Sequence, residues 1–337
     1  MTALISRNSS KFIGFVIAFC LFALFFMSSI AFGQTSMTLG TVLDAFIHYD
    51  PASSDHIIIR TTRVDRAVIA AVIGASLAIA GTLMQALTRN PLASPSIFGI
   101  NAGAIFFIVM AATFFSISSL LQYMWLAFLG AAAAAALVYF LGSLGGEGLS
   151  SLKIVLAGAA VSALFTSFTS GMLVISENSL QGVLFWLAGS VSGRTLDMLL
   201  PLLPFMAVAG LLAFGLGNSI NILTSGDEVA KGLGQRTTLV KLLMAVVVVV
   251  LAGGAVAIGG SIGFIGLIVP HIVRGLIGID HRWVIPYSAL LGASTLLLAD
   301  IGSRFVIMPQ EMPIGVMTAF LGAPFFIYLA RRGFREK

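Results

Sequence analysis

The uncharged stretches of this sequence are too long and too apolar for the surface of a water-soluble protein. A helix needs about 20 mainly apolar residues to cross the hydrocarbon core of a bilayer. Segments free of Asp, Glu, Lys and Arg that meet or approach this length are 12–43, 67–88, 90–146, 154–176, 198–226, 242–273, 283–299 and 312–330. Charged residues make up only 9% of the 337-residue chain, against about 25% in soluble domains. The chain is therefore predicted to be an all-α membrane protein.

Two of these stretches are long enough to hold more than one helix. Stretch 90–146 contains a polar break near 114–122, and stretch 242–273 contains the glycine-rich break 259–263. We predict a single transmembrane domain over residues 1–337. Its ten spans are expected near 12–33, 64–86, 95–113, 122–142, 152–174, 198–217, 238–258, 262–279, 284–303 and 313–330. Residues 11–33 also resemble a signal peptide, but their apolar run exceeds the roughly 7–15 residues of such a segment, so a retained first helix is favoured.

The positions of Lys and Arg predict the orientation, because cytoplasmic loops carry an excess of these residues. With the N-terminus in the cytoplasm, most of the 18 basic residues fall inside: Arg7, Lys11, Arg89, Lys153, Lys231, Arg236, Lys241, Arg274, Arg282, Arg331, Arg332, Arg335 and Lys337. The remainder fall outside: Arg60, Arg63, Arg66, Arg194 and Arg304. A single helix over 242–279 would put the basic C-terminal segment outside. Ten spans with both termini cytoplasmic is therefore the predicted topology.

The predicted spans carry little of the chemistry of ion-coupled carriers or membrane enzymes. Secondary transporters bury ionisable residues in their spans. Here only Asp300 and Arg304 come close, four residues apart at the end of the ninth span, where they can pair with each other. The sequence contains no G-x-x-x-x-G-K-[ST] phosphate loop and no H-E-x-x-H. Its one G-x-S-x-G match, GGSIG (259–263), lies at the break between two predicted helical spans and not on the strand-to-helix turn that this motif needs. An ion-coupled carrier is therefore the less favoured alternative, no catalytic residues are predicted, and uphill transport would need a separate ATPase.

The cytoplasmic segment 221–236 is polar and punctuated by glycine. Its acidic pair, Asp227 and Glu228, precedes Lys231, an order that suits the macrodipole of a short surface helix. From composition alone two interpretations stay open. The segment is either an ordinary solvated connection or a helix that seats in a cytoplasmic partner.

Four separated segments resemble, in order, the FecCD-type (BtuC-like) permeases. They are GASLAIAGTLMQALTRNPLASPSIFGINAGA (74–104), LTSGDEVAKGLG (223–234), GFIGLIVPHIVRGLIGIDHR (263–282) and EMPIGVMTAFLGAPFFIYL (311–329). These permeases are the membrane subunits of ABC importers for iron-siderophores, haem and cobalamin. The resemblance implies the type II ABC importer permease fold, with ten helices per subunit, in the bacterial cell membrane.

The same resemblance implies partners and cargo. A second permease subunit, identical or homologous, would share the pathway with this chain. Two copies of an ATP-binding subunit would drive transport, and an extracytoplasmic binding protein would deliver the substrate. An iron(III)-siderophore is the favoured cargo, with cobalamin and haem as alternatives. The chain itself is expected to bind no cofactor, metal or nucleic acid, because ATP and Mg²⁺ belong to the ATPase and iron enters only as chelated cargo.

Three sets of site residues follow from the resemblance by position. The coupling loop 220–236 would dock in the ATPase through Ser225, Gly226, Asp227, Glu228, Ala230, Gly232 and Leu233. A positive patch on the outer face would dock the binding protein through Arg63, Arg66 and Arg304. The R-x-P-R of the family reads RVDR here, and Asp65, in place of proline, would weaken the patch or pair with Arg66. The cytoplasmic gate would lie at Ser150, Ser151 and Leu152. As alternatives, the arginines would be interfacial anchors and the serines would cap a helix.

The segment RNPLASP (89–95) is predicted to be the cytoplasmic turn between the second and third spans. Pro91 and Pro95 would stop one helix and shape the start of the next. Asn90 would satisfy backbone groups at the break, and Arg89 would mark the inner face.

Overall fold

The computed structural model describes residues 4–5, 7–33, 35, 37–115, 117, 119–144, 151–175, 184 and 186–333, and every regular element in these residues is a helix. A helix lies in each of the ten predicted ranges: α1 (Asn8–Ala31), α4 (Val64–Thr88), α5 (Ile100–Phe114), α6 (Leu120–Ser143), α7 (Ser151–Ile175), α10 (Leu203–Gly215), α13 (Thr237–Gly259), α14 (Ile265–Ile277), α15 (His281–Phe305) and α16 (Ile314–Gly333). Shorter helices lie between them: α2 (Leu39–Ile47), α3 (Ser54–Ile58), the π-helix η1 (Ile59–Arg63), the 3-10 helix η2 (Pro95–Phe98), α9 (Leu196–Leu199), α11 (Gly217–Thr224) and α12 (Asp227–Gly232). The prediction of an all-α chain is confirmed for this part.

Length and composition identify several of these helices as membrane spans. In the described residues six are long and apolar enough to cross a bilayer: α1, Ser54–Thr88 (α3, η1 and α4 in one continuous helix), α6, most of α7, α13 and α15. The pair α10 and α11, bent by 54°, makes a seventh if it forms one span. The helices α5 and α14 and residues Ile314–Ile327 of α16 are shorter. The chain is therefore a multi-span membrane protein, and the count of ten stays a prediction.

Helix α4 lies at the centre of the molecule. It packs against α15, α13 and α14, and most of its residues are buried, whereas α1 exposes a face of large apolar side chains. A Cβ on Gly74 would lie 2.4 Å from the carbonyl oxygen of Gly292 in α15. One on Gly81 would lie 1.8 Å from that of Gly266 in α14. Glycine at these positions lets the helix backbones approach closely, as is common in membrane proteins.

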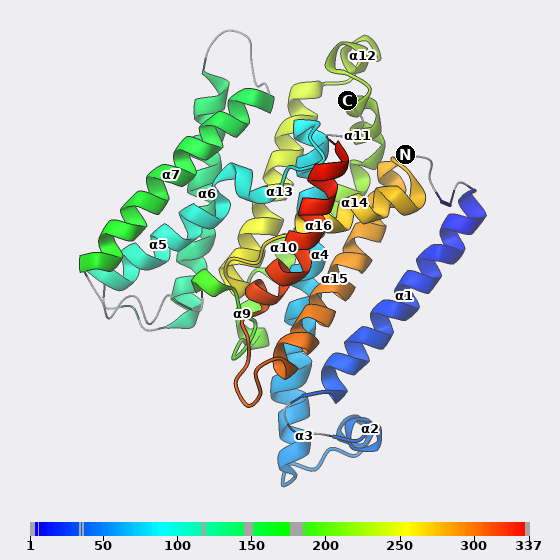
Figure 1. The fold of residues 1–337 in the computed structure, drawn as a ribbon, viewed down its shortest axis with the longest axis vertical. Coiled ribbons are helices and arrows are strands. Elements are labelled where there is room, and N and C mark those ends of the chain that lie inside the picture. Colours follow the sequence, from blue (N-terminus) through cyan, green and yellow to red (C-terminus); the bar gives the residue numbers. More distant parts are fainter. Residues whose placement is uncertain are drawn as a thin grey trace.

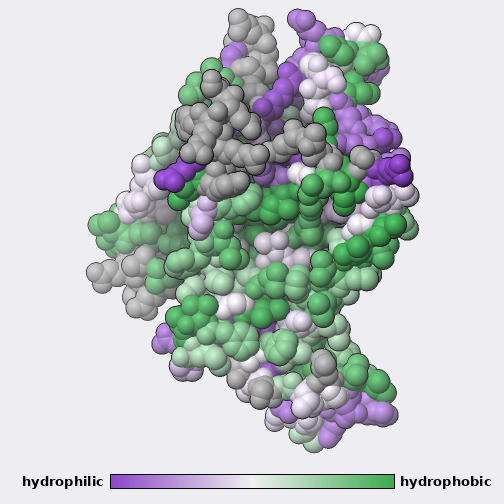
Figure 2. Space-filling model, turned by 45° about the vertical axis from the view of Figure 1, so that its right-hand side comes forward, coloured by the Kyte–Doolittle hydropathy of each residue, from purple (hydrophilic) through white to green (hydrophobic). Residues whose placement is uncertain are grey.

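The short helices and the chain ends gather at two opposite ends of the molecule. Helix α1 begins and α16 ends where α11 and α12 lie, whereas α2 and α3 lie at the other end (Figure 1). On the face shown in Figure 2, the described surface between these ends is mostly hydrophobic, and hydrophilic residues are concentrated toward the ends. We name the end that carries α12 the inner end, and the end that carries α2 and α3 the outer end.

The turn after α4 forms as the sequence predicts. Arg89 ends the helix in the left-handed conformation, with φ at 51°. The side chain of Asn90 accepts a hydrogen bond from the backbone N–H of Leu92 at 2.9 Å. Pro95 opens η2, and Gly99, with φ at 69°, leads from η2 into α5. These residues separate two helices at the inner end and fix the direction of the chain after Arg89, where α4 ends.

Candidate coupling and docking sites

Two arginines cap the outer end of α1. The last carbonyl groups of a helix have no partner within the helix and carry a partial negative charge. Arg63, from η1, and Arg304, from α15, donate to these groups through their Nη1 atoms. The carbonyl oxygens accept the bonds at 2.6–3.0 Å and belong to Ser29, Ile30, Ala31 and Phe32. The cap therefore ties a peripheral helix to two segments that are distant in sequence.

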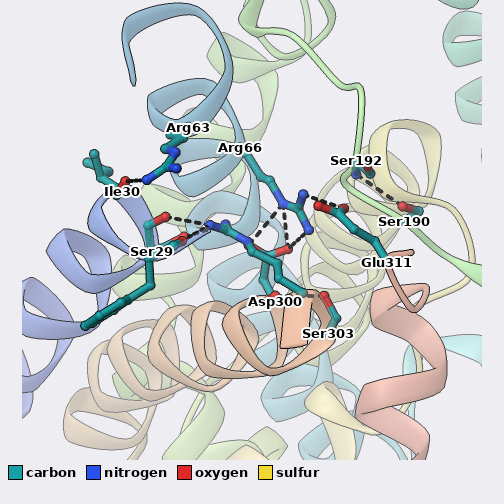
Figure 3. A network of polar contacts seen from close by, with 11 residues as sticks. Ser29, Ile30, Arg63, Arg66, Ser190, Ser192, Asp300, Ser303 and Glu311 are labelled. Carbon is teal, nitrogen blue, oxygen red and sulfur yellow. Dashed lines mark hydrogen bonds and ion pairs between the residues drawn. The ribbon is translucent and has the colours of Figure 1, made fainter. Parts of the chain in front are cut away.

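Asp300 is the carboxylate that two arginines share in this region. Arg66 bonds its Oδ1 through Nη2 at 2.8 Å and through Nε at 2.9 Å, and Arg304 bonds its Oδ2. Arg66 also lies 2.6 Å from Glu311, which comes from the loop before α16 (Figure 3). The predicted pairing of Asp300 with Arg304 is confirmed. We name Arg63, Arg66, Asp300, Arg304 and Glu311 the outer network.

The three predicted docking arginines lie at the outer end but are buried in the isolated chain. Their exposed fractions are 5% for Arg63, 9% for Arg66 and 2% for Arg304. The expectation of an open positive patch is therefore wrong for the single subunit. The physical reason is that the end of α1 and the carboxylate of Asp300 offer acceptors that draw the guanidinium groups inward. Their role in docking stays a prediction.

Asp65 does not pair with Arg66. Its Oδ2 accepts a hydrogen bond from the backbone N–H of Leu196 at 3.0 Å, at the first turn of α9. A side-chain oxygen at the start of a helix satisfies an N–H group that has no partner within the helix. The interpretation of Asp65 as a partner of Arg66 is therefore wrong, and the residue at the position of the family proline fastens α9 to the start of α4.

At the inner end, the carboxylate of Asp227 holds α12 against the body of the protein. Its Oδ1 lies 2.6 Å from Nη2 of Arg89, and its Oδ2 lies 2.5 Å from Nζ of Lys241 in α13. Arg89 also donates to the carbonyl oxygen of Leu223 at 3.1 Å. Burial raises the pKa of Asp227, but the hydrogen bond and charge of Lys241, with the charges of Arg89 and Lys231, outweigh burial and lower the pKa below its ordinary value. The carboxylate is therefore ionised at neutral pH. We name Arg89, Asp227 and Lys241 the inner clamp.

The predicted coupling residues lie on two sides of this short helix. Asp227 and Ala230 face the body of the permease, and Ala230 is fully buried. Gly226 turns the chain into α12 with φ at 128°, a conformation that favours glycine. The others are exposed: Ser225, Glu228, Gly232 and Leu233. Leu233 is 70% exposed and Val229 beside it is also exposed, so the tip of this polar segment presents apolar side chains to its surroundings.

The predicted gate is described only in part. Ser150 lies outside the described residues, and Ser151 is the first residue of α7. Leu152 follows it with an exposed side chain. Helix α7 begins at the inner end (Figure 1). The position of the segment agrees with the predicted side of the membrane, and its role as a gate stays a prediction.

The sequence did not reveal which side chains pair with one another in the outer network and in the inner clamp. In the sequence, Glu311 is the first residue of a segment that resembles the family, and Arg89 lies just before the prolines of RNPLASP. Lys241 stands out there only as a basic residue on the cytoplasmic side. Each of these signals marks a position but names no partner, because 138 positions separate Arg89 from Asp227 and 245 separate Arg66 from Glu311. Among the described residues, no group of three or more His, Cys, Asp or Glu side chains could hold a metal ion.

Comparison with known proteins supports the resemblance. Residues 21–332 match the FecCD transport family. The chain is 53% identical to the probable siderophore transport system permease protein YfiZ of Bacillus subtilis (strain 168), over 97% of this chain and 98% of that protein. It is 41% identical to the ferric enterobactin transport system permease protein FepD of Escherichia coli (strain K12), over 90% of each. A solved structure, described as an inward-facing conformation of a metal-chelate type ABC transporter, has a TM-score of 0.83 and 30% identity, over 94% of this chain and 98% of that chain.

These matches extend over nearly the whole chain. The apolar helices and the permease relatives make the chain a multi-pass protein of the bacterial inner membrane. Its relatives are transport permeases, so it is a transport subunit and not an enzyme. The chain belongs to the FecCD transport family of ABC importer permeases.

Proposed function

We propose that this chain is the permease of an ATP-driven importer for an iron(III)-siderophore. The observation that carries the proposal is 53% identity, over nearly the full length of both chains, to a protein named as a probable siderophore transport system permease. Relatives named for ferric enterobactin and iron citrate support the same cargo class. A hemin permease of Yersinia pestis is 38% identical over 80% of this chain, so haem is an alternative, as is cobalamin.

We infer an assembly with partners at both ends of the permease. A second permease subunit, identical or homologous, would share the pathway, two ATP-binding subunits would sit at the inner end, and a binding protein would sit at the outer end. Ten spans with both termini cytoplasmic suit this arrangement, because α1 begins and α16 ends toward the inner end of the molecule, the end that carries α12 (Figure 1). The chain would bind no cofactor of its own. ATP and Mg²⁺ would stay on the ATPase, and iron would pass only as chelated cargo.

The inner clamp supports α12 as the coupling element. The exposed side of α12 would seat in the ATPase, while Asp227 holds its inner side to Arg89 at the end of α4 and to Lys241 in α13. These two helices pack against each other in the centre of the permease. When ATP closes the ATPase pair and moves α12, the clamp would pass the movement to both central helices at once.

The outer network is the proposed docking region for the binding protein. A carboxylate of that protein would compete with Asp300 and Glu311 for Arg66, or it would bind Arg63 beside the carbonyl groups of α1 to which Arg63 donates. We expect Arg63→Gln combined with Arg66→Gln to slow association at low salt, since charge pairs act mainly on encounter and orientation. Exposed Arg60, which lies over the ring of Tyr49, gives the control Arg60→Gln. An unchanged association rate in a double variant that still assembles with its ATPase would reduce these arginines to interfacial anchors.

The gate is proposed at Ser150, Ser151 and Leu152, where α7 begins. Short hydroxylated side chains would let two permease subunits approach across the pathway. We therefore expect Ser150→Cys or Ser151→Cys to crosslink two permease subunits in one nucleotide state and not in another. Crosslinking that is independent of nucleotide would place the constriction elsewhere.

Reconstituted uptake tests the transport proposal directly. Proteoliposomes that contain the permease complex would receive binding protein loaded with a radioactive iron(III)-siderophore, with haem or cobalamin as competing cargo. Uptake should require ATP in the lumen that holds the ATPase, and the iron chelate should be preferred. Uptake that persists without ATP and stops with a proton-gradient uncoupler would support an ion-coupled carrier instead.

A further inference from the structure

A cavity with charged and polar side chains in its wall opens at the inner end of the permease. Its volume is about 500 Å³, and its wall includes Gln85, Arg89, Asn221, Thr224, Arg274 and Asp280. Binding sites for small ligands range over about 300–1,000 Å³. The wall brings together the last turns of α4 and α14, helix α11 and the loop before α15. The wall also includes Ser225, a proposed coupling residue, and Arg89 belongs to the inner clamp, but the transport proposal assigns no task to Gln85, Arg274 or Asp280.

Arg274 is a partly buried cation in this wall that has no carboxylate partner among the described residues. Its guanidinium donates to Oε1 of Gln85. The amide of Gln85 donates in turn to the carbonyl oxygens of Gly266 and Leu267 at 3.3 and 3.2 Å. Gln85 is buried, so it fixes the direction of Arg274 without supplying negative charge. A guanidinium has five N–H donors, and among the described residues the side chain of Arg274 donates to Gln85 alone, which leaves further donors for an acceptor in the cavity.

The remaining charges of the wall leave the cavity positive. Its carboxylate, Asp280, is already bonded to Arg282 and to Asn221, each at 2.7 Å. Arg89 is a second cation and is bonded to Asp227 of the inner clamp. Arg89 and Asp280 therefore each have a partner already, and the charge of Arg274 is left without a carboxylate among the described residues. An anion would complete the set.

The cavity lies where spanning helices end. Arg274 belongs to the last turn of α14 and Gln85 to the last turn of α4. The N-terminal segment that leads into α1 is fastened beside Arg274, since the backbone N–H of Ile5 donates to the carbonyl oxygen of Leu276 at 2.9 Å. From there α1 exposes a face of large apolar side chains, and Ile279 in the cavity wall is exposed as well. A cavity with charged side chains in its wall, beside apolar surface at the ends of spans, matches the headgroup layer of a membrane.

We propose that this cavity binds the phosphate group of an anionic phospholipid of the cytoplasmic leaflet, with Arg274 as the main contact and Gln85 as the residue that positions it. Guanidinium and phosphate form charge-assisted, often bidentate hydrogen bonds, and basic pockets between spanning helices suit anionic headgroups. The inference rests on the proposed orientation, in which the inner end faces the cytoplasm. It does not rest on the cargo or on coupling.

Native mass spectrometry of the assembled permease–ATPase complex tests the site. The complex would be taken from nanodiscs of phosphatidylcholine with or without phosphatidylglycerol. The wild type should retain phosphatidylglycerol, and Arg274→Gln should bind it about tenfold more weakly, because a hydrogen bond to a charged group contributes that much. Thr224→Glu should act likewise by placing a competing carboxylate in the wall without removing Arg274. Arg331→Gln removes an exposed cation of α16 that lies outside both the cavity wall and the coupling loop, and it should change nothing.

Further outcomes separate this site from its alternatives. Equal retention by the wild type, Arg274→Gln and Thr224→Glu would overturn the proposal. Inorganic phosphate would also be tested on the delipidated complex. If phosphate raises its unfolding temperature and phosphatidylglycerol does not displace the phosphate, the cavity binds free phosphate, and the assignment to a lipid is overturned. Loss of the ATPase from Arg274→Gln with unchanged lipid retention would assign Arg274 to a carboxylate of the ATPase and would also overturn it. None of these readouts measures uptake, so their failure leaves the transport proposal standing.

Discussion

Replacing Asp227 by Asn is expected to lower ATP-driven uptake roughly tenfold while the fold survives, since coupling free energies between sites commonly reach that size. Asparagine keeps the size of the side chain but removes the charge that holds Arg89 and Lys241. Helix α12 would then move under the ATPase without moving α4 and α13. Asp227 and Arg89 are half-exposed, so the lost ion pair should cost only about 0–1 kcal/mol of stability. Uptake, substrate-stimulated ATP hydrolysis and thermal unfolding of one preparation would separate coupling from folding.

A matched control lies one residue away. Glu228 is exposed and makes no ion pair with a described residue, so Glu228→Gln removes a neighbouring carboxylate without touching the inner clamp. Glu228 is itself a proposed contact with the ATPase, so any loss of uptake in this variant should come with weaker ATPase binding, whereas Asp227→Asn should keep the ATPase bound. Arg89→Gln should resemble Asp227→Asn, and the double variant should be little worse than either single one, because the two changes remove the same link. Fully additive losses would contradict a shared clamp.

The largest effect on stability is expected from Asp300→Asn. Asp300 is fully buried and compensates Arg66 and Arg304, so the variant leaves two neighbouring guanidinium groups without this carboxylate. Breaking a buried ion pair from one side costs about 3–5 kcal/mol. The variant should accumulate poorly in membranes and unfold at a clearly lower temperature in detergent.

Glu311→Gln provides the comparison for this prediction. Glu311 is partly exposed, and of Arg66 and Arg304 it bonds only Arg66. Water can therefore replace part of the interaction that Glu311→Gln removes. Its effect on the unfolding temperature should be the smaller of the two. Equal unfolding temperatures for Asp300→Asn and the wild type would mean that the outer network contributes little to the fold.

The helices and the breaks between them follow from local composition. The glycine-rich segment after Gly259 divides α13 from α14, and Gly260 adopts a φ of 73° that disfavours other residues. Pro91, Asn90 and Pro95 likewise mark the end of α4 and the start of η2. These features depend on residues that are neighbours in the sequence. A reading of the sequence therefore predicts their positions to within a few residues.

The partners of the charged residues do not follow from the sequence in the same way. Arg63 and Arg304 look like outer surface charges until the end of α1 is placed beside them. Asp65 stands next to Arg66 in sequence, yet its carboxylate turns to α9. Asp227 belongs to the predicted coupling loop but bonds the permease rather than facing outward. Each choice depends on which acceptor or donor the tertiary packing brings near, and composition does not carry that information.

The cap on α1 places a constraint on biogenesis. The first helix to be synthesised ends in carbonyl groups whose partner Arg304 is 275 positions from Ser29, near the end of α15. Asp300 lies in the same late helix, α15, so Arg66 has no Asp300 to pair with until that helix has been synthesised. The outer end of the permease is therefore closed by one of its last segments to enter the membrane. A nascent chain that stops before α15 presents unpaired guanidinium groups and bare helix carbonyls at the membrane surface, and in this way an unfinished permease differs chemically from a complete one.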